Sequence, residues 1–253
     1  MVDYEVRGRV AVLTLNRPEA RNAVNGALAA AMEEAIDRLE DDPEVWAGVL
    51  THVGPVFSAG ADLKAIAAGE ASTLATPRGG FAGLVQRERT KPLIAAIDGP
   101  ALAGGCEIML ACDLAVASTA ARFGLPEVKR SLVAAAGGLF RLPRMLPRRI
   151  ALEIGITGEP IGAERAYQFG LINRLCEPGE AFETAMALAD LVNQAAPLAV
   201  RETRQIMLTA PDLPDEDGWA RSLACMGKLA RTEDFAEGPR AFIEKRDPVW
   251  KGR

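Results

Sequence analysis

One stretch of 22 residues, from Pro92 to Asp113, limits most strongly what this chain can fold into. It begins with a short apolar run, Leu93–Ile97, that ends at a Gly-Pro pair, which is the pattern of a buried strand followed by a turn. Gly104-Gly105 then precedes a segment that favours a helix. A helix that begins at a glycine pair leaves unpaired N–H groups where an anion can bind. The stretch predicts a strand-to-helix junction, which serves either anion binding or only close packing.

A second junction of the same kind lies earlier in the chain. Residues 46–53 have the pattern of a buried strand, residues 57–60 have the composition of a loop, and Ala61 opens a short helix. If the two strands are adjacent and parallel, both junctions fall on the same edge of the sheet, and one N–H group from each can point at one oxygen. Such an oxyanion hole without side chains suits a thioester enolate, and losing one donor typically raises the barrier by roughly 3–4 kcal/mol.

The order of the expected elements predicts an α/β fold. Strands at residues 2–6 and 10–15, a helix at 27–40 with Asn25 as its N-cap, and the strand at 46–53 begin a βα repeat, which becomes a sheet with helices outside it. Residues 69–80 are expected to be a mobile loop over a pocket, and residues 81–89 a helix. Beyond residue 148 the pattern is nearly all helical.

Charge and residue usage narrow the function classes. The 253 residues carry a net charge of −5, which argues against a general nucleic-acid surface. The apolar runs are shorter than a membrane span, and the first residues lack the apolar core of a signal peptide, so a cytoplasmic location is expected. A single histidine, His52, argues against a His-based zinc site and against a Ser-His-Asp triad. No Gly-x-Gly-x-x-Gly follows the first strand, which argues against dinucleotide binding. If the protein is an enzyme, carboxylates and backbone groups are therefore expected to carry out its chemistry.

Seven motifs, spread nearly from end to end of the chain, keep a common order and spacing. They lie at residues 16–23, 58–64, 103–113, 123–127, 156–158, 166–173 and 238–246. Together they strongly resemble the crotonase (enoyl-CoA hydratase/isomerase) superfamily, and they identify the superfamily far better than the reaction within it. The resemblance implies an α/β fold with a crotonase (ClpP-like) ββα superhelix core at residues 1–195. The resemblance also implies a C-terminal helical trimerisation region at residues 196–253.

The resemblance also implies the catalytic groups. The amides of Ala61 and Gly104 match the oxyanion hole for the thioester carbonyl, and Glu107 and Glu127 match two glutamates on either side of a catalytic water. Adding water across an α,β-unsaturated thioester needs a base for the water and an acid for Cα, and burial and mutual repulsion can separate the pKa values of two carboxyls. Taken alone, each glutamate is an ordinary acid in the first turn of a helix. The presence of both favours hydration or dehydration.

Coenzyme A is expected as part of the substrate, and no metal or redox cofactor is implied. The resemblance points to loop backbone near Ala59 and Ala23 for the adenine, and to Arg21 and Lys64 for the phosphates, although each charge is also compatible with a solvated surface. Lys245 is a weaker candidate that a neighbouring subunit would supply. The complete set of expected substrate and coenzyme A contacts is Arg21, Ala23, Ala59, Asp62, Leu63, Lys64, Ala135 and Lys245.

One segment departs from the pattern of the family's hydratases. They usually read Ile-Pro-Gly-Ala-Gly-Gly after the second glutamate, whereas residues 133–138 here read Val-Ala-Ala-Ala-Gly-Gly. Ala135 therefore replaces a glycine whose amide helps to hold the water, and alanine keeps that N–H group. Lys129 and Arg130 add two charges where hydratases are often apolar. These differences leave the substrate and the reaction direction open.

Three functions follow from these observations. The leading one is an enoyl-CoA hydratase, a lyase that adds water to a trans-2-enoyl-CoA. The second is a same-fold isomerase, or a specialised dehydratase that acts on a polar acyl-CoA. The third, of another class, is an acyl-CoA-binding protein with little catalysis. A homotrimer, or a homohexamer made of two trimers, is expected, with no nucleic-acid or membrane partner.

Overall fold

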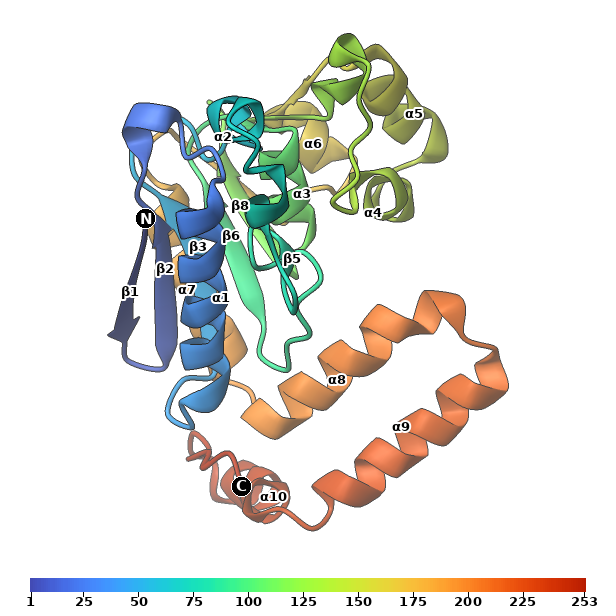
Figure 1. The fold of residues 1–253 in the computed structure, drawn as a ribbon. Coiled ribbons are helices and arrows are strands. Elements are labelled where there is room, and N and C mark those ends of the chain that lie inside the picture. Colours follow the sequence, from blue (N-terminus) through green and yellow to red (C-terminus); the bar gives the residue numbers. More distant parts are fainter.

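Six strands form the central sheet of the computed structural model, which describes all residues from 1 to 253 (Figure 1). The strand order is β1-β2-β3-β6-β8-β11, and only β1 runs antiparallel to its neighbour. The parallel pairing of β3 with β6 brings the ends of these two strands to one edge of the sheet, as the sequence predicted. The strands are β1 Val2–Arg7, β2 Val10–Leu15, β3 Ala47–His52, β6 Leu93–Ile97, β8 Leu114–Ser118 and β11 Arg174–Cys176.

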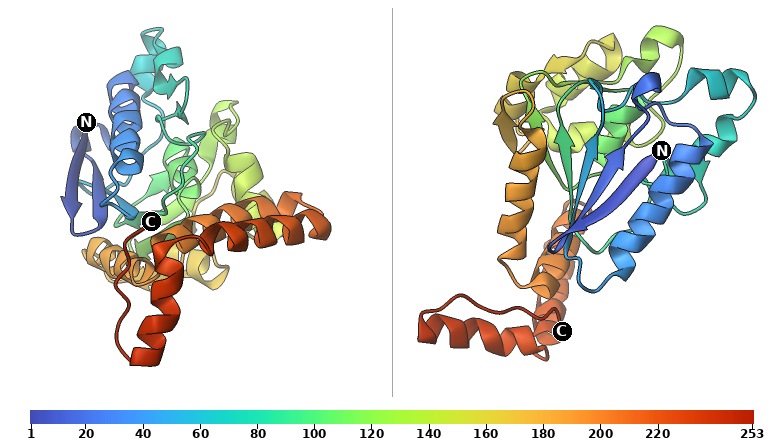
Figure 2. Two further views of the ribbon diagram at one scale, coloured as in Figure 1. Left: turned by 90° about the horizontal axis from the view of Figure 1, so that it is seen from below. Right: turned by 90° about the vertical axis from the view of Figure 1, so that its left-hand side faces the viewer.

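Helices cover both faces of this sheet (Figure 2). Helix α1 (Gly26–Asp41) begins where Asn25 Oδ1 accepts a hydrogen bond from Leu28 N at 2.9 Å, so the predicted N-cap is confirmed. Its buried side chains, spaced three and four residues apart, join the main core. Helix α7 (Ala181–Asn193) packs on the opposite face through Ala185 and Ala189. The sheet is therefore buried on both sides, which explains its apolar central strands.

A small three-stranded sheet places the two glutamates near each other. Strands β7 (Ala101–Leu102) and β9 (Arg122–Gly124) run parallel, and β10 (Ile161–Gly162) pairs with β9. Helix α3 (Gly104–Leu110) begins just after β7, and the 3₁₀ helix η3 (Pro126–Arg130) begins just after β9. Because β7 and β9 point the same way, the segments that carry Glu107 and Glu127 leave the sheet side by side.

The segment after α2 (Leu63–Ala67) differs from the prediction. Residues 71–81 form the 3₁₀ helix η2 (Ala71–Leu74) and a hairpin of β4 (Ala75–Thr76) and β5 (Gly80–Phe81). Residues 82–86 form turns and residues 87–89 are irregular, instead of the predicted helix. Gly83 has a φ of +68°, and a Cβ there would lie 2.2 Å from Ala29 O of α1. A positive φ does not occur in a right-handed helix, and the close approach to Ala29 O leaves room only for a glycine at residue 83. Glu33 of α1 holds the hairpin by accepting a hydrogen bond from Gly79 N at 2.9 Å.

The last three helices form an arm that extends away from the sheet (Figures 1 and 2). These helices are α8 (Pro197–Thr209), α9 (Asp215–Leu229) and α10 (Glu233–Glu244), and the 3₁₀ helix η4 (Ala210–Asp212) follows α8. Earlier in the chain lie α4 (Gly138–Met145), α5 (Arg148–Thr157) and α6 (Ala163–Gln168). Asp113 anchors the arm by pairing with Arg89 at 3.0 Å and with Arg204 of α8 at 2.8 Å. The predicted division at residues 195 and 196 stays a prediction. None of the helices is both long enough and apolar enough to span a membrane.

Candidate active site

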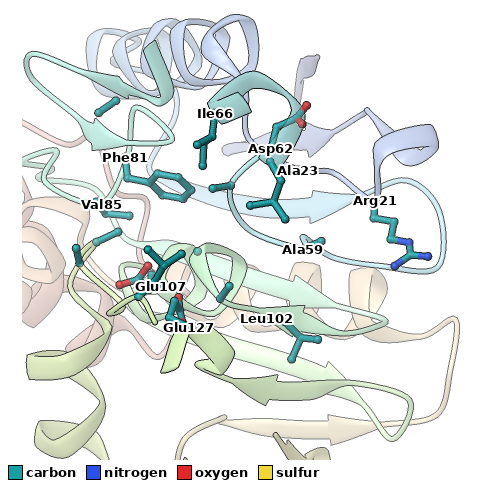
Figure 3. A pocket seen from close by; sticks show the side chains of 18 of the residues that line it. Arg21, Ala23, Ala59, Asp62, Ile66, Phe81, Val85, Leu102, Glu107 and Glu127 are labelled. Atoms are coloured by element: carbon teal, nitrogen blue, oxygen red, sulfur yellow. The ribbon is translucent and has the colours of Figure 1, made fainter. Parts of the chain in front are cut away.

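A cavity of about 1150 Å³ lies where the two strand-to-helix junctions meet (Figure 3). Its walls come from both junctions, the β4–β5 hairpin, η3 and the loop at residues 131–137. All but one of the predicted site residues line it, and the exception is Lys245. The predicted site residues that line the cavity are Arg21, Ala23, Ala59, Ala61, Asp62, Leu63, Lys64, Gly104, Glu107, Glu127 and Ala135. The fold therefore gathers residues from four separate motifs around one space.

The two junctions touch through glycine. Gly60 has a φ of +89°, and a Cβ at this position would lie only 2.7 Å from Gly104 N. Ala61 N and Gly104 N donate no hydrogen bond to the backbone, whereas Ala59 N donates to Arg21 O at 3.0 Å. Two unpaired N–H groups thus lie next to each other on the cavity wall, as an oxyanion hole requires.

Ala103 supports this arrangement with an unusual backbone. It is the N-cap of α3 and has a φ of 52° and a ψ of −128°, a conformation that costs a non-glycine residue of the order of 1–3 kcal/mol. Its N–H group donates to Gly124 O of β9 at 2.9 Å, which holds the strained residue in place. No sequence pattern indicates this strain, because alanine rarely occupies such a conformation.

Glu107 lies on α3 and is buried, with 3% of its surface exposed. Its Oε1 accepts a hydrogen bond from Gly138 N at 2.9 Å. Burial raises the pKa of Glu107, and the nearby Glu127 carboxyl adds to this effect. A Cβ at Gly138 would lie 3.1 Å from Glu107 Cγ, so the glycine gives the carboxyl its room. Gly138 was not among the predicted site residues, although a Gly-Gly pair at residues 137–138 is a sequence signal for the start of a helix.

Glu127 extends from η3 beside Glu107 (Figure 3). Its Oε2 is buried and has no hydrogen-bond partner, and burial raises the pKa of this carboxyl as well. An unpartnered buried oxygen is rare because it has lost its contact with water. The pair therefore offers two carboxyls whose protonated forms persist to higher pH than usual, which suits acid and base work.

Asp62 is engaged within the chain, although it also lines the cavity. Its Oδ1 caps α2 by accepting from Lys64 N at 2.9 Å, and its Oδ2 pairs with Arg17 at 2.7 Å. The hydrogen bond from Arg17 holds the pKa of Asp62 below its usual range. These contacts fix the start of α2 beside Ala61, and the predicted contact of Asp62 with the substrate stays a prediction.

The positive groups expected for coenzyme A lie away from the glutamates. Arg21 is exposed and is at the other end of the view in Figure 3. Lys64 is exposed at the start of α2. Lys245 ends α10, which lies away from the cavity of its own chain (Figure 1), and its predicted coenzyme A contact stays a prediction.

The segment that departs from the hydratase pattern divides into two parts. Lys129 turns outward and pairs with Glu159, whereas Arg130 lines the cavity. Ala135 is exposed on the loop at residues 131–137 and also lines the cavity. Only one of the two extra charges therefore faces the site.

Comparisons with known proteins agree with this geometry. The sequence model of the enoyl-CoA hydratase/isomerase family matches residues 5–253. A carnitinyl-CoA dehydratase from Salmonella typhimurium is 42% identical over 252 residues, covering 97% of this chain and 96% of that protein. Among solved structures, an enoyl-CoA hydratase from Mycobacterium tuberculosis H37Rv is 43% identical with a TM-score of 0.96, covering 100% and 99% of the two chains. A carnitinyl-CoA hydratase from Mycobacterium avium is 47% identical with a TM-score of 0.78, covering 100% and 98%. The expected crotonase fold is confirmed, and the chain belongs to the enoyl-CoA hydratase/isomerase family.

Proposed function

We propose that this protein is an enoyl-CoA hydratase, which adds water across the trans-2 double bond of an enoyl-CoA thioester. One observation carries the proposal: two carboxyls with raised pKa values, those of the buried Glu107 and the half-buried Glu127, share a cavity with two unpaired N–H groups. Hydration needs this combination of a base, an acid and an oxyanion site.

The environments of the two carboxyls suggest their roles. The N–H group of Gly138 stabilises the charged form of Glu107, whereas Glu127 Oε2 has no hydrogen-bond partner. Glu107 then takes a proton from water as the water oxygen bonds to Cβ. The electron pair of the Cα=Cβ bond forms a double bond between Cα and the thioester carbon, and the carbonyl π pair moves to the thioester oxygen. The amides of Ala61 and Gly104 hold this enolate, and Glu127 delivers its proton to Cα.

A second candidate is the reverse reaction on a polar acyl group. Several relatives are called carnitinyl-CoA dehydratase, and Arg130 adds a charge to the cavity wall. The same groups run the reaction backwards, because the acid and the base exchange roles. A binding protein with little catalysis is the remaining alternative, and it would not need the two raised carboxyl pKa values.

Coenzyme A would be part of the substrate, with Arg21 and Lys64 on its phosphates and no further cofactor. We also propose a homotrimer or a dimer of trimers, because large side chains on the arm, among them Trp219 and Phe242, are exposed as in a surface that another chain covers. A cytoplasmic location is favoured by four free cysteines.

The test follows the absorbance of the conjugated thioester after adding crotonyl-CoA to the wild type, Glu107→Gln and Glu127→Gln. Loss of absorbance with the wild type, reduced at least about a hundredfold in each variant, would support the assignment of both carboxyls. If the wild type binds crotonyl-CoA without absorbance loss, the hydratase proposal is wrong and polar 3-hydroxyacyl-CoA substrates are tested next.

A further inference from the structure

A second cavity, of about 310 Å³, lies between η3, α4 and α5, and we call it the α4–α5 cavity. Its volume is within the range of about 300–1,000 Å³ that is usual for small-molecule sites. Glu127 and Val133 line both this cavity and the candidate active site. The two spaces therefore adjoin at the carboxyl that the proposed reaction uses.

The lining of the α4–α5 cavity is almost wholly apolar. Glu127 and Arg148 are the only polar side chains on it. Leu152 and Ile156 of α5 and Leu139 of α4 line it, and they remain exposed to 46%, 71% and 52%. Apolar side chains that gather around a hollow are typical of a surface that binds an apolar group.

The proposed chemistry points an acyl chain toward this cavity. The water that Glu107 and Glu127 share adds to Cβ, so Cβ must lie within reach of the Glu127 carboxyl. The rest of the acyl chain begins one bond beyond Cβ. Because Glu127 also lines the α4–α5 cavity, this cavity adjoins the place where that part of the chain starts.

Gly155 on α5 gives the cavity part of its room. A glycine inside a helix lowers its stability by roughly 0.5–1 kcal/mol relative to alanine. A Cβ built on Gly155 meets no atom within 4 Å, so no close packing in this chain requires the glycine. Because glycine has no side chain, residue 155 leaves space on the wall of the α4–α5 cavity.

We propose that the α4–α5 cavity binds the distal part of an apolar acyl chain, so that the preferred substrate is an enoyl-CoA longer than crotonyl-CoA. This inference rests on the proposed hydratase function and defines its substrate class. It favours the leading function over the dehydration of a polar acyl group, because the lining provides one cation and no other polar partner besides the catalytic carboxyl.

Two other arrangements would leave this cavity without an acyl chain. Phe81 and Val85 form an apolar wall on the main cavity, and a long chain there would lie on the other side of the glutamates. Alternatively, a second copy of this chain covers α4 and α5. Each arrangement predicts a different outcome when the α4–α5 cavity is filled.

The experiment fills the cavity with Gly155→Phe and uses Gly155→Ala as the matched control. Hydration of crotonyl-CoA and of trans-2-decenoyl-CoA is measured for each, together with calorimetric binding of butyryl-CoA and decanoyl-CoA. Each buried methylene is worth about fourfold in affinity, so a ring that excludes three of them weakens decanoyl-CoA binding on the order of 50-fold. Butyryl-CoA binding and crotonyl-CoA hydration stay within about twofold of the wild type, and Gly155→Ala behaves like the wild type for both chain lengths.

The outcomes separate the inference from the function on which it rests. If crotonyl-CoA is not hydrated by the wild type, the hydratase proposal fails, while the binding measurements still test the cavity. If Gly155→Phe leaves the preference between decanoyl-CoA and butyryl-CoA unchanged, the inference is overturned. A change in oligomeric state by size-exclusion chromatography, without a change in preference, would overturn it in favour of a subunit interface. If Gly155→Phe does not fold, Gly155→Leu makes the same test with a smaller side chain.

Discussion

Gly60→Ala tests whether the backbone N–H groups of Ala61 and Gly104 stabilise the negative charge that develops on the thioester oxygen in the proposed reaction. The new Cβ would lie 2.7 Å from Gly104 N and 2.9 Å from Ala103 Cβ. A contact with backbone cannot be relieved by rotating a side chain. For the distance to Gly104 N to reach an ordinary 3.4 Å, the two junctions must separate by about 0.7 Å.

The size of the effect follows from this displacement. A misplacement of about 1 Å can lower a rate by roughly a hundredfold, and losing one oxyanion donor lowers kcat by about 10²–10³. We therefore expect kcat for an enoyl-CoA to fall by about a hundredfold. The KM should change less, because the amides bind the enolate more strongly than the ground-state carbonyl. Alanine at a φ of +89° also costs of the order of 1–2 kcal/mol of stability.

Gly69→Ala separates the two effects. Gly69 has a φ of +83°, close to that of Gly60, but a Cβ there meets no atom within 4 Å. Both variants share the cost of alanine at a positive φ, and Gly60→Ala should lose further stability in denaturant unfolding because of its contact with backbone, but only Gly60→Ala should lose kcat. If both variants keep kcat within about threefold of the wild type, the junction amides do not limit the reaction and the oxyanion-hole assignment is refuted.

Three further predictions concern the anchor of the arm, the carboxyl pair and the coenzyme A end. Asp113→Ala should destabilise the protein by about 3–5 kcal/mol in denaturant unfolding, because it leaves the buried Arg89 without its partner, and a loss below 1 kcal/mol would contradict this anchor. Burial raises the pKa of Glu107, so the folded chain binds that proton more tightly than the unfolded chain, and stability is lost as pH rises from the usual carboxyl range through the raised pKa. Glu107→Gln should therefore flatten the fall in unfolding free energy as pH rises above the usual carboxyl range, and an unchanged slope would show that another group causes it. Arg21→Ala should raise KM about tenfold for crotonyl-CoA but not for crotonyl-pantetheine, whose phosphates are absent, and equal effects on both would exclude a phosphate contact.

The elements that the sequence located well are those with a strong local pattern. The strands at Val10–Leu15 and Leu93–Ile97 have the predicted bounds, because each is a short apolar run that ends at a turn residue. The helix predicted at residues 81–89 failed for a non-local reason. Gly83 approaches Ala29 O of α1, and no pattern within residues 81–89 reports on a contact with a residue that lies 54 positions earlier.

The same distinction applies to the site. Glu107 and Glu127 could be selected because their motifs match a family, and the fold places both on one cavity. Gly138 could not be assigned as the donor to Glu107, because that hydrogen bond joins residues 31 positions apart that meet only after folding. The strained Ala103 and the second cavity at Glu127 also depend on tertiary packing, which a single sequence does not display.

The chemistry and the substrate preference depend on different parts of this molecule. The amides and the glutamates are held by backbone features of the β7–β9 sheet and by close contacts at Gly60 and Gly138 that a larger residue would disturb. The walls that meet the acyl group come instead from the β4–β5 hairpin, the loop at residues 131–137 and α5, where Gly155 has free space. Substitutions in these walls can change the accepted acyl group without moving a catalytic group. The departure at residues 133–138 therefore alters a cavity wall and leaves the Gly138 donor in place, so the proposed hydratase and dehydratase functions differ in the acyl group that the walls would have to accept.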